Sequence, residues 1–242
     1  MAGTPRNGPD LAALDCVRLE RLEPAGNLPL SLFRLHYRLT AEPDAVALSR
    51  LTSPELERLS KFRFVEDRVR FAGARSALRT LLAAQLGLEP ERVPIEVGSN
   101  GKPILAPAFR LHFNVSHSGA EGLLALSAQG AVGVDVERHR PDVDYLGVAT
   151  RMFAEDELAE LLGLAEANAR HRFYRGWVYK EAVLKALGLG IGVDTKVFSV
   201  LEQNDLRLSA SPGALSVPPE RVTVLSLPAP AGYSAALAFI GT

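Results

Sequence analysis

Alternating apolar and polar residues predict a strand at residues 132–137, whose sequence is Val-Gly-Val-Asp-Val-Glu. Its three valines share one face, because strand side chains repeat every two residues, and the other face carries Gly133, Asp135 and Glu137. Neighbouring carboxylates are ligands that Mg²⁺ uses together with the phosphates of a substrate. The glycine beside them would let a bulky ligand approach the backbone. The alternative is an edge strand with a solvated acidic face.

The same alternation predicts further strands along the whole chain. They are expected at residues 17–22, 30–39, 93–97, 111–115, 123–127, 193–200, 206–210, 222–227 and 233–240. Residues 24–27, with the sequence Pro-Ala-Gly-Asn, are expected to form the turn between the first two strands. The strand at 123–127 is expected to pair with the strand at 132–137 as a hairpin around Gln129 and Gly130.

Apolar residues at helical spacing predict helices between these strands. The first is expected to begin at Ser53, with this serine as the N-cap and a proline directly after it. The others are expected at residues 66–87, 145–151, 155–162 and 173–187. Seven cations fall within the first two helices and their junction: Arg58, Lys61, Arg63, Arg68, Arg70, Arg75 and Arg79. They indicate either a solvated face or a phosphate site, since arginine matches phosphate geometry with paired donors.

Composition narrows the class of protein. The chain has 242 residues, 47% of them hydrophobic, which is enough for a substantial core. Its net charge of −1 gives no general basic field for nucleic acid, and its single cysteine excludes an internal disulfide. We expect a cytoplasmic protein with no membrane span, because no apolar run is long enough and the first residues lack the apolar core of a signal peptide.

Two polar turn segments carry residues that turn chemistry does not fully explain. Lys102 follows an Asn-Gly turn and precedes a proline, although a single lysine is most often exposed to solvent. Ser116 and His117 stand at the end of the strand predicted at 111–115, where small polar residues are also ordinary turn material. A histidine at such a position could donate a hydrogen bond to a phosphate oxygen.

The last helix places a carboxylate and an ammonium on one face. Trp177, Glu181 and Lys185 are spaced four residues apart, so they share that face. An exposed Glu–Lys pair would be the ordinary explanation. The chain's single tryptophan on the same face argues against it, because tryptophan is usually largely buried and buried charges need partners.

Three segments now occur in a characteristic order. They are Asn-Val-Ser-His-Ser at 114–118, Gly-Val-Asp-Val-Glu at 133–137 and Trp-Val-Tyr-Lys-Glu-Ala-Val-Leu-Lys at 177–185. This ordered set resembles the Sfp-like 4′-phosphopantetheinyl transferases. The arginine-rich helix, the turn before Lys102 and the pair Gly232-Tyr233 resemble that family too, so the likeness extends from about Ser53 to the end. Val178 departs from the family, which usually has Ser, Thr or Cys there.

The resemblance implies an α+β fold of two similar α/β halves, related by a pseudo-twofold axis, with the active site in the cleft between them. We expect a flexible tail at residues 1–12, halves at 13–130 and 131–242, and a monomer. The implied reaction moves the phosphopantetheine arm of coenzyme A to a serine of an apo acyl or peptidyl carrier protein. It depends on Mg²⁺ and releases adenosine 3′,5′-bisphosphate.

The resemblance also implies roles for individual residues. Asp135, Glu137 and Glu181 would bind Mg²⁺ on the coenzyme A pyrophosphate, and Glu181 would act as, or position, the base that deprotonates the serine. Lys185 would contact the phosphates near the breaking bond. Further contacts with coenzyme A would come from Lys180, Ser116, His117, Lys102, Arg70 and Arg63, with His117 at the 3′-phosphate. Apart from the resemblance, we expect a transferase to have an apolar docking surface for the carrier protein near the cleft, at Met152 and Phe153.

Two other functions fit the same residues. A Mg²⁺-dependent phosphohydrolase acting on a nucleotide or pyrophosphate would use these carboxylates with water as the nucleophile. A non-catalytic module that binds coenzyme A is the second alternative. Such a module would be expected to have lost a carboxylate or Lys185, and all of these residues are present.

Overall fold

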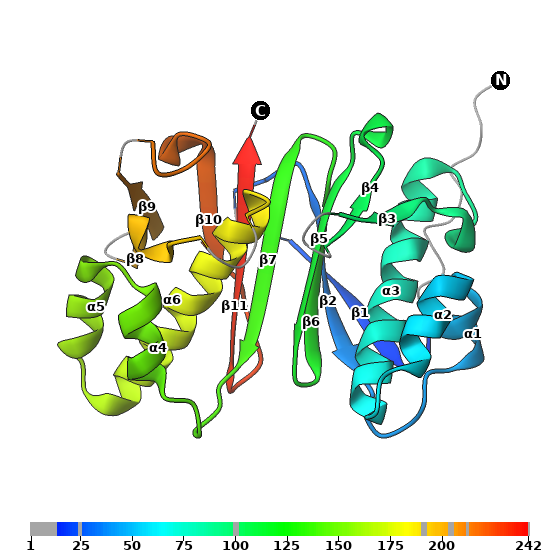
Figure 1. The fold of residues 1–242 in the computed structure, drawn as a ribbon, viewed down its shortest axis with the longest axis horizontal. Helices are drawn as coiled ribbons and strands as arrows, with labels where there is room; N and C mark the ends of the chain where they lie inside the picture. The colour runs from blue at the N-terminus through cyan, green and yellow to red at the C-terminus, as the bar shows by residue number, and fades with distance from the viewer. Residues whose placement is uncertain are drawn as a thin grey trace. The chain divides into compact units, whose positions relative to one another are not determined.

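The computed structural model describes residues 14–23, 26–98, 102–189, 193–202, 206–211 and 213–241, which form a mixture of helices and strands (Figure 1). They fall into two compact units, each considered by itself below. The first contains the described parts of Met1–Arg21, Phe33–Phe109 and Ala120–Leu124, and the second those of Leu22–Leu32, Arg110–Gly119 and Ala125–Thr242. The part of the chain before residue 130, expected to be one half, is therefore divided between the two units. The expected tail at 1–12 and turn residues 24 and 25 lie outside the described residues.

Strands occur close to where the alternation predicts them. The first six are β1 (Val17–Leu22), β2 (Ser31–Tyr37), β3 (Ile95–Val97), β4 (Pro103–Leu105), β5 (His112–Ser118) and β6 (Glu121–Ser127). The remaining five are β7 (Gly130–Arg138), β8 (Phe198–Glu202), β9 (Leu206–Ala210), β10 (Val222–Ser226) and β11 (Tyr233–Gly241). They make sheets in the orders β1-β2-β6-β5 and β10-β11-β7, and the pairs β3-β4 and β8-β9.

The expected hairpin between residues 123–127 and 132–137 does not form. β6 lies between β2 and β5, so both of its edges are occupied, and β7 pairs with β11 instead. The antiparallel register of β7 and β11 runs from Arg138 opposite Tyr233 to Gly130 opposite Gly241. Local turn chemistry at Gln129 and Gly130 is therefore overridden by a long-range pairing of nine residues.

The helices also follow the predicted spacing. They are α1 (Ala45–Ser49), α2 (Ser53–Ser60), α3 (Val65–Leu86), α4 (Tyr145–Met152), α5 (Glu155–Leu162) and α6 (Glu166–Ala186). The N-cap of α2 is Thr52 rather than Ser53, and its backbone N–H donates to the Glu55 carboxylate at 2.9 Å. α6 begins seven residues before the expected start at Phe173. Among the described residues, no helix combines the length and apolar character that a membrane span requires.

In the first unit, the arginine-rich helix α3 is not simply a solvated face. The Arg79 side chain is 2% exposed and its guanidinium makes two bonds to the Glu55 carboxylate, at 2.8 and 2.9 Å. A third nitrogen donates to the carbonyls of Pro90 and Val93. Arg75 pairs with the same carboxylate at 3.3 Å. Arg79 and Arg75 thus connect α3 to α2, and Arg79 also connects it to the segment after α3. Because their guanidinium groups serve these contacts, we no longer count the two arginines as candidates for a phosphate site.

In the second unit, α6 lies across one face of the sheet β10-β11-β7 (Figure 1). Its apolar side packs on small and branched residues of this sheet, with β8 completing the core. The buried residues of this core include Val178, Tyr179, Val183, Phe198, Val200, Val224, Ala236 and Ala238. Ala236 stands opposite Asp135 and Ala238 opposite Gly133 in the β7–β11 register. The face of β7 that carries Gly133 and Asp135 therefore faces α6.

At Gly133 the backbone of α6 approaches β7 closely. A Cβ atom built on Gly133 would lie 2.1 Å from the carbonyl oxygen of Ala182 and 2.5 Å from the backbone nitrogen of Ala186. Both are backbone atoms of the helix, so they cannot move aside as a flexible side chain could. The glycine thus makes room for α6, and the expectation that it makes room for a ligand is wrong.

Replacing Gly133 tests this packing. We expect Gly133→Ala to lower the free energy of unfolding by about 3 kcal/mol, because the helix backbone must shift to admit a methyl group. Urea unfolding of the purified protein measures the change. Gly163→Ala is the matched control, since Gly163 has negative φ and its nearest atom to an added Cβ lies at 3.5 Å. Equal unfolding midpoints for Gly133→Ala and the unsubstituted protein would contradict the assignment.

Candidate active site

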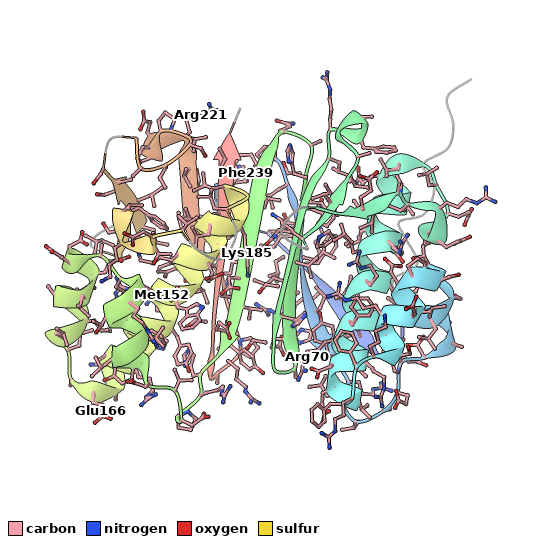
Figure 2. All side chains as sticks on the ribbon, in the orientation of Figure 1. Arg70, Met152, Glu166, Lys185, Arg221 and Phe239 are labelled. Atoms are coloured by element: carbon pink, nitrogen blue, oxygen red, sulfur yellow. The ribbon has the colours of Figure 1, made fainter. Side chains whose placement is uncertain are left out.

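The centre of the candidate site is Asp135, which is 2% exposed on β7. Its Oδ1 accepts a hydrogen bond from the Lys185 ammonium at 2.6 Å and another from the Ser116 hydroxyl at 2.7 Å. Its Oδ2 is buried and has no hydrogen-bond partner in the described part of the chain. Lys185 extends from α6, as labelled in Figure 2, and its contact with Asp135 joins the helix to the strand.

Two further carboxylates, those of Glu137 and Glu181, interact electrostatically with Asp135. Burial raises the pKa of Glu137, and the neighbouring Asp135 and Glu181 carboxylates raise it further. Burial also raises the pKa of Glu181, with Asp135 acting in the same direction and Lys185 in the opposite one. Both glutamates thus respond to Asp135, because like charges that are partly withdrawn from water disfavour ionisation. The site concentrates negative charge that a cation would relieve.

These residues fit a divalent cation shared with a ligand. Mg²⁺ is usually held by one or two carboxylates while phosphates and waters complete its shell, so it needs no cage made by protein alone. Among the described residues, no three or more Asp, Glu, His or Cys side chains converge as such a cage. The buried, unpartnered Oδ2 of Asp135 and the raised pKa values of Glu137 and Glu181 are the observations that favour a cation here.

Serines of β5 hold both carboxylates of β7. The Ser116 hydroxyl donates to Asp135, and the Ser118 hydroxyl donates to Glu137 Oε2 at 2.8 Å. A hydroxyl has one proton, so Ser116 in this arrangement has none to offer a phosphate oxygen. The sequence analysis gave Ser118 no role. The sequence did contain a signal for such a role, because Ser116 and Ser118 are two residues apart, as are Asp135 and Glu137.

The two parts of the chain that carry this geometry match models of one family. Residues 131–238 match the model described as the 4′-phosphopantetheinyl transferase superfamily, and residues 40–129 match the 4′-phosphopantetheinyl transferase N-terminal model. The AcpT 4′-phosphopantetheinyl transferase of Escherichia coli is 35% identical over 58% of this chain and 72% of its own length. The chain belongs to the 4′-phosphopantetheinyl transferase superfamily.

Other members of the superfamily align over a similar or larger share of the chain. The 4′-phosphopantetheinyl transferase HetI of Nostoc sp. is 41% identical over 58% of this chain and 61% of its own. A 4′-phosphopantetheinyl transferase of Bacillus subtilis is 28% identical over 71% of this chain and 75% of its own. The chain thus spans about three fifths of the length of HetI.

The resemblance to the superfamily also implied contacts for four other residues. His117 is exposed and alternates to the side of β5 opposite Ser116 and Ser118. Arg63 is exposed in the first unit, with its guanidinium 5.5 Å from the centre of the Phe64 ring. Arg70, also in the first unit, pairs with Asp67 at 2.7 Å. Lys102 is partly buried there, and residues 100 and 101 of its turn lie outside the described residues.

Lys180 does not reach the site, and its expected contact with phosphate is corrected. Its side chain is fully buried and forms an ion pair with Glu157, also fully buried, at 2.8 Å. The ammonium donates as well to the carbonyls of Thr195 and Phe198, at 2.7 and 2.6 Å. Three acceptors satisfy its three protons. Lys180 therefore ties α6 to α5 and β8, one residue before Glu181.

The expected docking surface at Met152 and Phe153 is also corrected in part. Phe153 is 2% exposed and stacks on Phe173 at 5.7 Å between ring centres, so it belongs to the core under α4 and α6. Trp177 packs at the edge of the same core, with its ring 5.4 Å from Phe173. An aromatic residue in this segment therefore serves packing rather than contact with a partner.

Removing the Lys180 ammonium tests its structural role. We expect Lys180→Met to lower the free energy of unfolding by about 3–5 kcal/mol, because it leaves the Glu157 carboxylate buried without a counter-charge. The comparison variant is Lys61→Met, which removes an exposed lysine paired with Glu57 at 2.8 Å. Urea unfolding should show almost no change for that control. Similar small losses in both variants would contradict the buried pair.

Proposed function

We propose that this protein transfers the 4′-phosphopantetheine group of coenzyme A to a serine hydroxyl of an apo acyl or peptidyl carrier protein. The product is the holo carrier protein, and adenosine 3′,5′-bisphosphate is released. The cluster of Asp135, Glu181 and Lys185 carries the proposal, because it brings a buried carboxylate with an unpartnered oxygen beside a second carboxylate and a cation. Membership of the superfamily supports the reaction class.

The proposed reaction exchanges one phosphorus–oxygen bond for another. The serine oxygen of the carrier protein forms a bond to the phosphorus that bears pantetheine, and the bond from this phosphorus to the bridging pyrophosphate oxygen breaks. The protein must hold the reacting groups in line and neutralise charge on the phosphate oxygens, since phosphoryl transfer is governed by positioning and electrostatics. A base must also take the proton of the serine hydroxyl.

Residues of α6 are suited to these two tasks. Glu181 would accept the serine proton, since burial raises its pKa and makes the carboxylate a stronger base. Lys185 would donate to a phosphate oxygen near the breaking bond. Its ammonium, one helical turn from Glu181, opposes the rise in that pKa and so helps Glu181 to remain ionised.

Strand β7 and helix α6 together supply the residues for the metal. Asp135, Glu137 and Glu181 would hold Mg²⁺, which, when bound, neutralises charge on the pyrophosphate. His117, Lys102, Arg70 and Arg63 remain proposed contacts of the nucleotide part of coenzyme A, with His117 at its 3′-phosphate. Ser116 is reassigned to the support of Asp135. The pseudo-twofold arrangement, the cleft, the monomeric state and the cytoplasmic location remain expectations from the sequence.

Measuring the intact mass of a carrier protein tests the proposed function. An apo acyl or peptidyl carrier protein, incubated with this protein, coenzyme A and Mg²⁺, should gain one phosphopantetheine, and EDTA should prevent the gain. Consumption of coenzyme A in the absence of a carrier protein would instead identify the phosphohydrolase. If several unrelated carrier proteins gained no mass while coenzyme A was bound but stayed intact, the result would favour the non-catalytic module.

Variants of the carboxylates test the proposed roles. We expect Asp135→Asn and Glu181→Gln each to lower the rate of carrier modification by about 100-fold or more, as is typical when a group that transfers a proton or neutralises charge is lost. Circular dichroism should show that both variants remain folded. Glu166→Gln makes the same change at an exposed position of α6, labelled in Figure 2, and should leave the rate unchanged. Near-normal rates for either site variant at saturating Mg²⁺ would refute its assignment.

A further inference from the structure

β5 is joined to β7 by hydrogen bonds in which its side chains take part. The side-chain oxygen of Asn114 accepts from the backbone N–H of Val134 at 2.9 Å. Further along, Ser116 donates to Asp135 at 2.7 Å and Ser118 donates to Glu137 at 2.8 Å. Because strand side chains repeat every two residues, the serine pair on β5 is in step with the carboxylate pair on β7.

The Ser118 hydroxyl is held in one orientation. It accepts a hydrogen bond from the backbone N–H of Arg138 at 3.1 Å while it donates to Glu137 Oε2. The N–H occupies one of the oxygen lone pairs, so the single hydroxyl proton is directed at the carboxylate. Glu137 is therefore fixed by a donor that is itself anchored to the backbone of β7, one residue beyond Glu137.

We propose that Ser118 is a positioning residue, which orients the Glu137 carboxylate for Mg²⁺. This inference rests on the proposed function, in which Glu137 is a metal ligand. Groups that hydrogen-bond a ligating carboxylate fix its orientation, and their loss typically weakens metal binding by about 10–100-fold. A hydroxyl bonded to an ionised acceptor also makes a stronger hydrogen bond than one between neutral groups.

Ser118 gives a cleaner test than Ser116. Ser116 shares Asp135 Oδ1 with Lys185, and the Lys185 ammonium also lies 3.3 Å from the Ser116 hydroxyl. A substitution at Ser116 would therefore change a lysine contact and a carboxylate contact together. The Ser118 hydroxyl bonds to Glu137 and to the backbone of β7, so its loss acts on the carboxylate directly.

The experiment is calorimetric titration of Mg²⁺ into the full chain saturated with coenzyme A. We expect Ser118→Ala to weaken Mg²⁺ binding by about tenfold, and Ser118→Thr, which keeps the hydroxyl, to stay within about twofold of the unsubstituted protein. Ser127→Ala is the matched control. Its hydroxyl on β6 likewise donates to an oxygen and accepts from a backbone N–H, but its partners are the carbonyl of Pro29 and the N–H of Gln129.

Affinity for coenzyme A in EDTA provides the second readout. It should be the same in all four proteins, because Ser118 acts on the metal through Glu137. Unchanged Mg²⁺ affinity in Ser118→Ala overturns the proposal, and so does a parallel loss of Mg²⁺ affinity, metal-free coenzyme A affinity and thermal stability, which would indicate a merely structural role. If Ser118→Ala does not fold, Ser118→Cys, a weaker donor, must show an intermediate loss of Mg²⁺ affinity.

Failure of the proposed function has a different signature. An unsubstituted protein that binds no Mg²⁺ with coenzyme A present would refute the metal assignment itself, and the role of Ser118 with it. An unsubstituted protein that binds Mg²⁺ and modifies a carrier protein, with an unaffected Ser118→Ala variant, would refute the role of Ser118 alone.

Discussion

The close contact between β7 and α6 at Gly133 is the constraint on which the candidate site depends. Any side chain at this position would meet backbone atoms of Ala182 and Ala186, so the helix can lie on the strand only because residue 133 has none. The contact lies two residues from Asp135 along the strand and beside Lys185 on the helix. Backbone packing therefore brings the Lys185 ammonium within 2.6 Å of the Asp135 carboxylate, two groups 50 positions apart in the sequence.

Charge is the second constraint on the same region. Burial and the Asp135 carboxylate raise the pKa of Glu137 and of Glu181, so the ionised forms of both glutamates are disfavoured. Lys185 and hydroxyl donors from β5 offset this effect in part. An unpartnered oxygen remains on Asp135. Such a set favours a ligand that brings a cation and phosphates together, which is the chemistry that the proposed transfer requires.

Local patterns predicted most elements, because alternation and helical spacing fix which face a residue occupies. They placed Asp135 beside Glu137 on a strand and Glu181 beside Lys185 on a helix; that these residues form one site was implied only by the family resemblance. Local patterns could not predict long-range packing. β7 pairs with β11 instead of forming the expected hairpin, and Gly133 accommodates a helix rather than a ligand. Lys180 shows the same limit, since its buried partner Glu157 lies 23 positions earlier on a helix whose packing the sequence pattern could not reveal.

The affinity for coenzyme A with and without Mg²⁺ tests the central claim most directly, because the claim joins metal and pyrophosphate at Asp135. Calorimetry should show that Mg²⁺ tightens the binding of coenzyme A to the unsubstituted protein by at least about tenfold, a coupling of about 1.4 kcal/mol. Asp135→Asn should bind coenzyme A equally with Mg²⁺ and with EDTA. Equal affinities under both conditions in the unsubstituted protein, or a full Mg²⁺ effect in Asp135→Asn, would contradict the account.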